Sequence, residues 1–378
     1  MTDPGVSAQS RLRSLQAFLE HDPGNLKLIA DTAAAAIEAD EPVEAERLIA
    51  RYARLSELPP ELLNLQGVAA LAQDRYEDAA PIFERLLHDA PGDTALRFNL
   101  AWCKAAAADY GGAEGLLDEA TTSAISAAAT LKVQCLHHLG RADDALRIGE
   151  PLAARYPLNS ELLGKLALAA FDVEDPVTAE RLALAAGAQH DALAALGTLR
   201  LGADRVSEAS AMFDEALSLY PEDARALLGK GLVLLTDNQP EAAVARLDQA
   251  AKLFGRHLGS WVASGWTYFA LGDRRTSRAR FETALSIDDT FAETHGGLAV
   301  LDVVEGDLES AQRRVTIALR LDRRCFGAAL ASSLLLAGRG ETAAAQRVRD
   351  LALNSAVAPG GRTLAQAIAA LSRQRTGS

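Results

Sequence analysis

The chain has 378 residues, of which 49% are hydrophobic and only 5% aromatic, and its net charge is −13. This charge argues against a surface for nucleic acid or for an anionic membrane, and three cysteines are too few for a disulfide framework. No uncharged apolar run is long enough to span a membrane, and residues 1–14 lack the apolar core of a signal peptide, so the sequence predicts a cytoplasmic protein without a membrane span.

The N-terminal segment predicts a single amphipathic helix. Leu12, Leu15 and Leu19 recur at helical spacing and are followed by Asp22 and Pro23. We therefore expect residues 6–25 to form a capping helix for whatever follows.

Residues 26–353 contain an internal repeat. The segment 75–91 recurs in altered form at 205–221 and again around Phe281. Aligning these segments divides the chain into ten units, and seven of the nine spacings between their first residues are 34. The predicted first residues are Leu26, Pro60, Thr94, Ser126, Ser160, His190, Ala224, Leu258, Ala292 and Phe326.

Small residues at two fixed positions support this register. The eighth and twentieth residues of the units are Gly, Ala or Ser in nineteen of twenty cases, as in the pairs Gly67 and Ala79 or Gly265 and Ser277. Small side chains let two helices approach closely. Each unit is therefore predicted to be a hairpin of two helices of about a dozen residues, with Gly272 and Gly306 in left-handed turns.

The C-terminal segment, residues 354–376, predicts a linker followed by a capping helix. Leu364, Ile368 and Leu371 stand at helical spacing within it. A terminal helix with a polar outer face shields the last unit of a repeat array.

The pattern resembles the tetratricopeptide repeat family over nearly the whole chain. Trp261, Gly265 and Tyr268 match the family pattern of the first helix, and Ala79, Phe83 and Pro91 match that of the second. The resemblance implies an all-α, right-handed superhelical solenoid of about ten hairpins with capping helices at both ends. It also implies a protein that binds protein partners in a concave groove and is not an enzyme.

The side of the first helices that faces away from the hairpin core is unusually apolar. Repeat positions 2, 5, 9 and 12 lie on that side, where an ordinary surface helix is polar. In the family this side lines the groove, so we expect a partner peptide or amphipathic helix to bind there; packing of neighbouring first helices is the alternative explanation. The predicted groove residues are Val68, Phe98, Trp102, Leu168, Phe171, Leu232, Trp266, Phe269 and Val300.

Charge suggests where other partners would bind. Residues 1–190 carry 29 Asp and Glu against 16 Lys and Arg, whereas residues 191–378 carry 22 of each. The excess favours solubility first, and a basic partner second. The alternative function is a structural subunit of a larger assembly, joined through its ends or through an outer basic patch. The predicted patch comprises Arg274, Arg275, Arg278, Arg313, Arg314, Arg323 and Arg324.

No motif for catalysis, a cofactor or a metal is present. The sequence lacks a phosphate loop, a dinucleotide fingerprint and a metal-binding His-Glu-x-x-His motif. The nearest approach to a site is Cys135 with His137 and His138, but adjacent helical residues point about 100° apart and do not share an ion. We therefore expect no cofactor, no metal and no catalytic residues.

Overall fold

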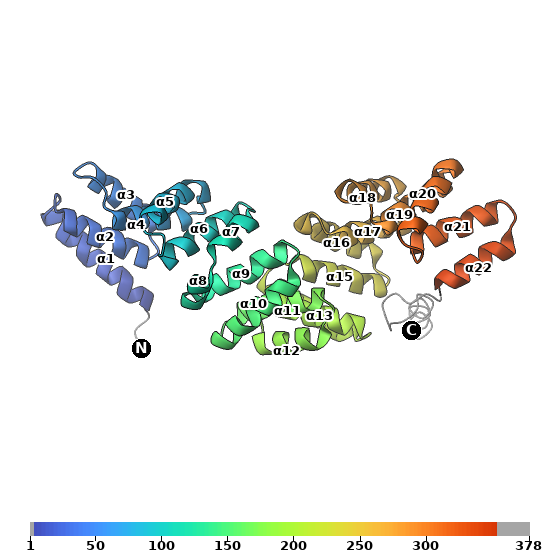
Figure 1. The fold of residues 1–378 in the computed structure, drawn as a ribbon, viewed down its shortest axis with the longest axis horizontal. Coiled ribbons are helices and arrows are strands. Elements are labelled where there is room, and N and C mark those ends of the chain that lie inside the picture. The colour runs from blue at the N-terminus through green and yellow to red at the C-terminus, as the bar shows by residue number, and fades with distance from the viewer. Residues whose placement is uncertain (1–3, 354–378) are drawn as a thin grey trace. The chain divides into compact units, whose positions relative to one another are not determined.

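The computed structural model describes residues 4–353, and in this part the chain consists of 22 α-helices without a strand (Figure 1). The protein is therefore all-α, as predicted. It divides into two compact units, residues 1–186 and 187–378, which we call unit 1 and unit 2 and describe separately. A single superhelix through both units stays a prediction.

Unit 1 begins with α1 (Pro4–His21), which packs against the first hairpin and buries Leu12 and Leu19 there. Five hairpins follow, each stacked on the next. Their first helices are α2 (Leu26–Glu38), α4 (Pro60–Leu71), α6 (Thr94–Ala106), α9 (Ser126–His138) and α11 (Ser160–Asp172). Their second helices are α3 (Pro42–Ala53), α5 (Tyr76–Asp89), α7 (Tyr110–Leu116) with α8 (Glu119–Ala124), α10 (Ala142–Arg155) and α12 (Pro176–Ala186).

Unit 2 contains the other five hairpins, stacked in the same way. Their first helices are α13 (His190–Gly202), α15 (Ala224–Thr236), α17 (Leu258–Ala270), α19 (Ala292–Glu305) and α21 (Phe326–Gly338). Their second helices are α14 (Val206–Leu219), α16 (Pro240–Phe254), α18 (Arg274–Ile287), α20 (Leu308–Leu321) and α22 (Thr342–Leu353).

All ten predicted unit starts coincide with the first residue of a helix. Polar residues just before these helices explain several of the boundaries. The side chains of Asn25, Asp93, Asn159 and Asp223 each accept a hydrogen bond from a backbone N–H in the first turn of the following helix. Such a cap satisfies donors that have no partner inside the helix, which fixes where the helix begins.

Three phenylalanines at repeat position 24 join consecutive hairpins. Phe83, Phe213 and Phe281 are fully buried. A Cβ atom added to Gly197, at position 8 of the same hairpin, would lie 2.6 Å from the Phe213 ring, and one added to Gly229 of the next hairpin would overlap it. The ring therefore fills the space left by two glycines on two neighbouring helices, which explains the small residues at position 8.

Every hairpin turn contains one residue with a left-handed backbone. Gly272 and Gly306 adopt this conformation as predicted, with φ of 81° and 89°. Six turns use a residue with a side chain instead, although a Cβ atom makes this conformation costly. The six are Asp40, Asp74, Ala108, Glu174, Asp204 and Asn238.

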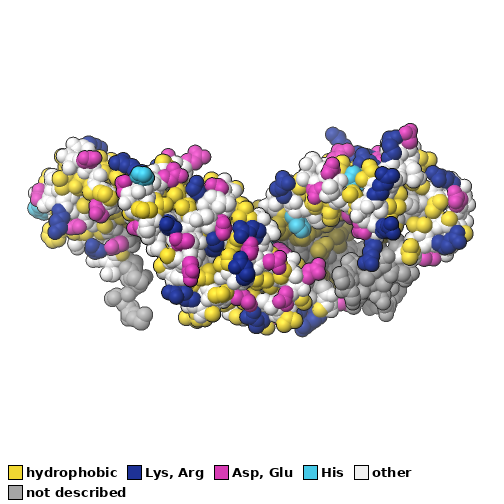
Figure 2. All heavy atoms as spheres, in the orientation of Figure 1, with side chains coloured by type: hydrophobic (Ala, Val, Ile, Leu, Met, Phe, Trp, Pro, Cys, Tyr) yellow, Lys and Arg dark blue, Asp and Glu magenta, His cyan; other side chains and the backbone are white. Residues whose placement is uncertain are grey.

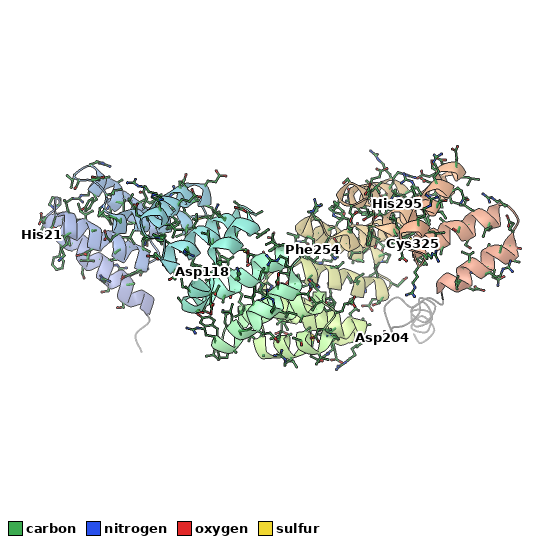
Figure 3. All side chains as sticks on the ribbon, viewed as in Figure 1. His21, Asp118, Asp204, Phe254, His295 and Cys325 are labelled. Atoms are coloured by element: carbon green, nitrogen blue, oxygen red, sulfur yellow. The ribbon has the colours of Figure 1, made fainter. Side chains whose placement is uncertain are left out.

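The third hairpin differs from the predicted pair of helices of about a dozen residues. Its second helix breaks into α7 and α8 at Leu117, whose ψ of 69° is not helical. Gly111, Gly112 and Gly115 lower the helix propensity of α7, and Asp118 starts α8 by accepting a hydrogen bond from the Thr121 N–H at 2.8 Å. Figure 3 labels Asp118 beside this break. The predicted linker and C-terminal cap, residues 354–376, lie outside the described residues.

Candidate binding surface

Four apolar side chains of unit 1 stand at repeat positions 5, 9 and 12 of α4 and α6, and three of them, Val68, Leu71 and Phe98, also pack against core clusters. We call Val68, Leu71, Phe98 and Trp102 the unit 1 stripe. Trp102 is 44% exposed, and the other three are half-buried. The rings of Phe98 and Trp102 meet edge to face with their centroids 6.0 Å apart. The stripe therefore presents one large, exposed aromatic side chain on a packed apolar base.

A hydrogen-bonded tyrosine lies beside Trp102. The Tyr76 hydroxyl donates to Asp74 Oδ1 at 2.6 Å, and this bond to a carboxylate raises the pKa of Tyr76. The Trp102 side chain partly offsets the rise, which shows that it lies close to the hydroxyl. The exposed indole thus has an apolar neighbour on its own helix and a polar neighbour from the preceding hairpin.

Two predicted groove residues are buried. Leu168 is 6% exposed and Val300 is 1% exposed, so neither side chain can contact a partner in this conformation. The burial of Val300 has a clear cause, since a Cβ added to Gly327 on α21 would lie 2.6 Å from the Gly296 carbonyl carbon on α19. The two backbones touch at this point, so α21 covers Val300, which packs in one core cluster with Ala331 and Leu335. Phe171 and Leu232 are half-buried.

In unit 2, Trp266 is part of an aromatic cluster. Its ring centroid lies 5.8 Å from that of Phe269, 5.4 Å from that of Phe281 and 6.0 Å from that of Phe326, each in an edge-to-face arrangement. Trp266 is half-buried by these contacts. Its first role is therefore packing between hairpins, whereas Trp102 has no comparable set of aromatic neighbours among the described residues.

The predicted basic patch contains two arginines that are used inside the fold. Asp302, only 4% exposed, accepts hydrogen bonds from Arg278 at 2.7 Å and from Arg314 at 2.9 Å. These two arginines join α18, α19 and α20 through Asp302, and their side chains are 24% and 27% exposed. Their part in a basic patch stays a prediction. Arg313 pairs with Glu309.

The remaining arginines belong to two separate groups. Arg274 and Arg275 are the first two residues of α18, whereas Arg323 and Arg324 follow the end of α20. The second helices run side by side, so the two groups lie about 15 Å or more apart along the helix direction. In the described part of the chain, none of these four forms an ion pair, and Figure 2 shows basic side chains over the region of α18 to α20.

The structure brings together one set of metal-ligand residue types that the sequence did not suggest. Nδ1 of His190 lies 2.7 Å from Asp223 Oδ2, and its Nε2 lies 3.6 Å from Asp191 Oδ2. Each ring nitrogen thus faces a different, buried carboxylate, and the imidazole bridges the starts of α13 and α15. Asp223 also caps α15, where its Oδ1 accepts a hydrogen bond from the Ala226 N–H at 2.9 Å.

The two adjacent histidines of the fourth hairpin have different partners. His137 Nε2 bonds Asp172 at 2.6 Å, whereas the His138 ring stacks on Tyr110 with centroids 4.2 Å apart. Cys103 and Cys135 are buried free thiols, and burial raises the pKa of each to about 11. Neither thiol is activated as a nucleophile. No helix within residues 4–353 has the length and apolar character needed to cross a bilayer.

Stacked antiparallel helix pairs with small residues at the close approaches define a helical-repeat protein. Models of the tetratricopeptide repeat match this chain, one over residues 70–132 and a second over residues 31–94 and 194–257. The chain therefore contains tetratricopeptide repeats. No curated protein sequence matches it.

Two solved structures resemble the fold. The first is the APC/C hetero-tetramer Cut9-Hcn1, with a TM-score of 0.57 and 13% identity, covering 82% of this chain and 62% of that one. The second is a monomeric mutant of IFIT1 with Gppp-AAAA, with a TM-score of 0.53 and 11% identity, covering 87% and 90%. The chain spans less than two thirds of the Cut9-Hcn1 chain that it matches. At these identities the likeness concerns the fold alone, a helical solenoid.

Proposed function

We propose that the protein is an interaction scaffold that holds an apolar or amphipathic segment of a partner protein against the unit 1 stripe. The observation that carries this proposal is the exposure of Trp102, which is 44% accessible although it stands on a row of apolar side chains. Tryptophan is among the residues that most often dominate binding energy at interfaces. The tetratricopeptide repeats supply the rigid frame that presents it.

The proposal assigns the protein no catalytic role. Its three cysteines are free and buried, which fits a reducing compartment such as the cytoplasm. On the first helices of the unit 2 hairpins, the exposed large apolar side chains are Phe326, Leu334 and Val304, each 36–38% exposed. Since Trp266 is occupied by packing, unit 2 offers smaller anchors than unit 1.

The test first identifies the partner and then measures its affinity. A photo-crosslinking amino acid at Ala105, one turn beyond Trp102 on α6, captures the chain that lies against the stripe. We expect Trp102→Ala to weaken binding of that chain about thirtyfold or more, because a buried aromatic anchor contributes about 2 kcal/mol. Phe18→Ala is the matched control, since Phe18 is an exposed aromatic residue of α1 away from the stripe.

Equal affinities of the wild type and Trp102→Ala would remove the basis for the proposal. The alternative is a subunit that joins an assembly through its outer arginines, and it is favoured by the absence of ion pairs at Arg274, Arg275, Arg323 and Arg324 among the described residues. In that case Arg323→Ala and Arg324→Ala, rather than Trp102→Ala, would release the partner.

A further inference from the structure

A cavity of about 360 Å³ opens at one end of the unit 1 stripe. It lies where α4 and α6 begin and α5 ends. Its walls are formed by Pro60, Glu61, Asn64, Leu86, Asp89, Ala90, Asp93, Ala95 and Leu96. Three of these side chains are carboxylates, and none is basic.

Most of the polar side-chain atoms around the cavity are hydrogen-bond acceptors. Asn64 Oδ1 is completely buried and has no hydrogen-bond partner. Within residues 4–353, Glu61 and Asp89 form no ion pair. Asp93 uses Oδ1 to cap α6, with the Ala95 and Leu96 N–H groups at 2.9 and 3.0 Å, and this leaves its Oδ2 available. An unpaired buried carbonyl oxygen is costly, so a movement of the Asn64 side chain that turns this oxygen toward a donor in the cavity is favoured.

The rest of the cavity wall is apolar. Leu86 and Leu96 are buried, and Pro60 and Ala90 complete the lining. Long cationic side chains bury their hydrocarbon stems along such walls and place the charged end at polar groups. The combination of an apolar wall with oxygen acceptors therefore fits lysine or arginine better than it fits a wholly polar or wholly apolar group.

The cavity and the stripe share the same faces of the same helices. On α4, Glu61 precedes Asn64 by three residues and Asn64 precedes Val68 by four, and on α6 Ala95 precedes Phe98 by three. Residues at these intervals lie above one another on one side of a helix. Glu61 is therefore about 10 Å along the helix axis from Val68, a distance that a few residues of a bound peptide span.

We propose that the cavity binds a lysine or arginine side chain of the partner segment whose apolar residues contact the unit 1 stripe. The inference rests on the proposed function and names the chemistry of the partner, which is a basic amphipathic segment. The acidic excess of residues 1–190 favours the approach of such a segment. A metal ion fits less well, since the one described group of His, Cys, Asp or Glu ligands that converges on a point involves His190, Asp191 and Asp223.

The experiment selects ligands for the full chain from a displayed library of random peptides. Peptides that bind are expected to combine an apolar or aromatic residue with a lysine or arginine. Glu61→Gln combined with Asp89→Asn is expected to weaken a selected peptide about tenfold or more, and replacing its cationic residue by norleucine is expected to have the same effect. Combining both changes should produce no further loss, because each removes the same contact.

A control variant and a second measurement separate the possible failures. Glu77→Gln removes an exposed carboxylate from the opposite end of α5 and is expected to change affinity less than about twofold. Circular dichroism establishes that each variant is folded. If Trp102→Ala weakens the selected peptides while Glu61→Gln with Asp89→Asn does not, the proposed function stands and this inference is overturned. If Trp102→Ala has no effect, the proposed function itself fails.

Titration with calcium chloride tests whether the cavity binds a metal ion instead of a cationic side chain. Two results together would identify the cavity as an ion site and overturn the inference. The wild type would bind calcium and the variant with Glu61→Gln and Asp89→Asn would not, and the selected peptides would lack a cationic residue. The inference would be supported if added salt lowers the affinity of the wild-type chain for the selected peptides and lowers the affinity of the double variant less.

Discussion

Gly229 lies directly against the ring of Phe213, so that the backbone of the first helix of one hairpin packs on a side chain from the second helix of the hairpin before it. Phe213 is fully buried and meets Gly197 of its own hairpin on the other side. The same relationship recurs one repeat pair later, where Phe281 lies between Gly265 and Gly297. The three-part contact sets the spacing between hairpins.

The variant Gly229→Ala is expected to lower the free energy of unfolding by about 1–3 kcal/mol, because the new methyl group overlaps the Phe213 ring and the backbones must separate. Gly202→Ala is the control, since nothing lies within 4 Å of a Cβ at that position. This control is expected to be neutral or to stabilise by up to about 1 kcal/mol through helix propensity. Urea denaturation of the two variants measures both effects, and equal losses would show that the contact does not limit packing.

The strained turn of the third hairpin predicts a stabilising substitution. Ala108 has a φ of 60°, in the left-handed region that disfavours a side chain. Ala108→Gly is expected to raise the free energy of unfolding by up to about 1 kcal/mol. The relief of backbone strain stabilises the folded chain, and the greater freedom of glycine in the unfolded chain offsets part of this gain. Ala107→Gly is the control, since Ala107 has a φ of −82° and should only lose stability. Thermal melts in which both variants are less stable than the parent would contradict the expectation.

Glu293 links stability to pH in unit 2. Burial raises the pKa of its carboxyl above 4.5, against the opposing effect of hydrogen bonds from Cys325 and the Gly327 N–H. The folded chain therefore binds this proton more tightly than the unfolded chain, so the contribution to stability is complete below about pH 4.5 and is lost as pH rises through the higher folded pKa.

Glu293→Gln removes this titration. We expect the variant to be more stable than the parent at pH 7 and to differ less from it at pH 4, as measured by the urea midpoint at both values. Glu282→Gln on the exposed side of α18 serves as the control and should shift the midpoint little at either pH. A loss of stability at pH 7 would mean that the bonds to Cys325 and Gly327 outweigh the cost of burying the charge.

The end of the described chain leaves apolar side chains uncovered. Leu351 on α22 is 74% exposed and Leu334 on α21 is 38% exposed. If residues 362–373 cap this hairpin, their removal should increase self-association, because the apolar face is then open to other molecules. Light scattering after gel filtration compares the chain truncated after residue 353 with one lacking only residues 374–378. Identical mass distributions would show that the segment is not a cap.

The sequence predicted the hairpins with unusual accuracy for a definite physical reason. Close approach of two helices tolerates only small residues, and this requirement marks positions 8 and 20 in almost every unit. Helix starts such as Thr94 and Ser160 were also marked by capping residues, Asp93 and Asn159. The break at Leu117 was missed because the unit that contains it is only two residues shorter than the others. The three glycines of α7 were the available signal.

The binding surface was less predictable, because exposure depends on neighbours that the repeat pattern does not reveal. Val68, Phe98 and Trp102 occupy the expected face, but the contact between Gly296 and Gly327 buries the equivalent Val300. Likewise, the repeat pattern does not reveal that Arg278 and Arg314 both donate hydrogen bonds to Asp302. Periodicity gives the side of the helix, and only the packing of adjacent hairpins gives the accessible surface.

The residue at repeat position 24 differs in size between hairpins, and this difference affects which hairpins unfold first. Phe83 joins the second hairpin to the third, whereas the third and fourth hairpins have Leu117 and Gly149 at that position, and Leu166 of the following hairpin fills the space beside Gly149. In a repeat array the cost of opening is a sum of terms between nearest neighbours, so weak couplings localise the first events of unfolding. Amide protons of α9 and α10 should consequently exchange with solvent sooner than those of α4 and α5. Unfolding would then begin in the interior hairpins, while the hairpins on the N-terminal side that a phenylalanine joins remain folded.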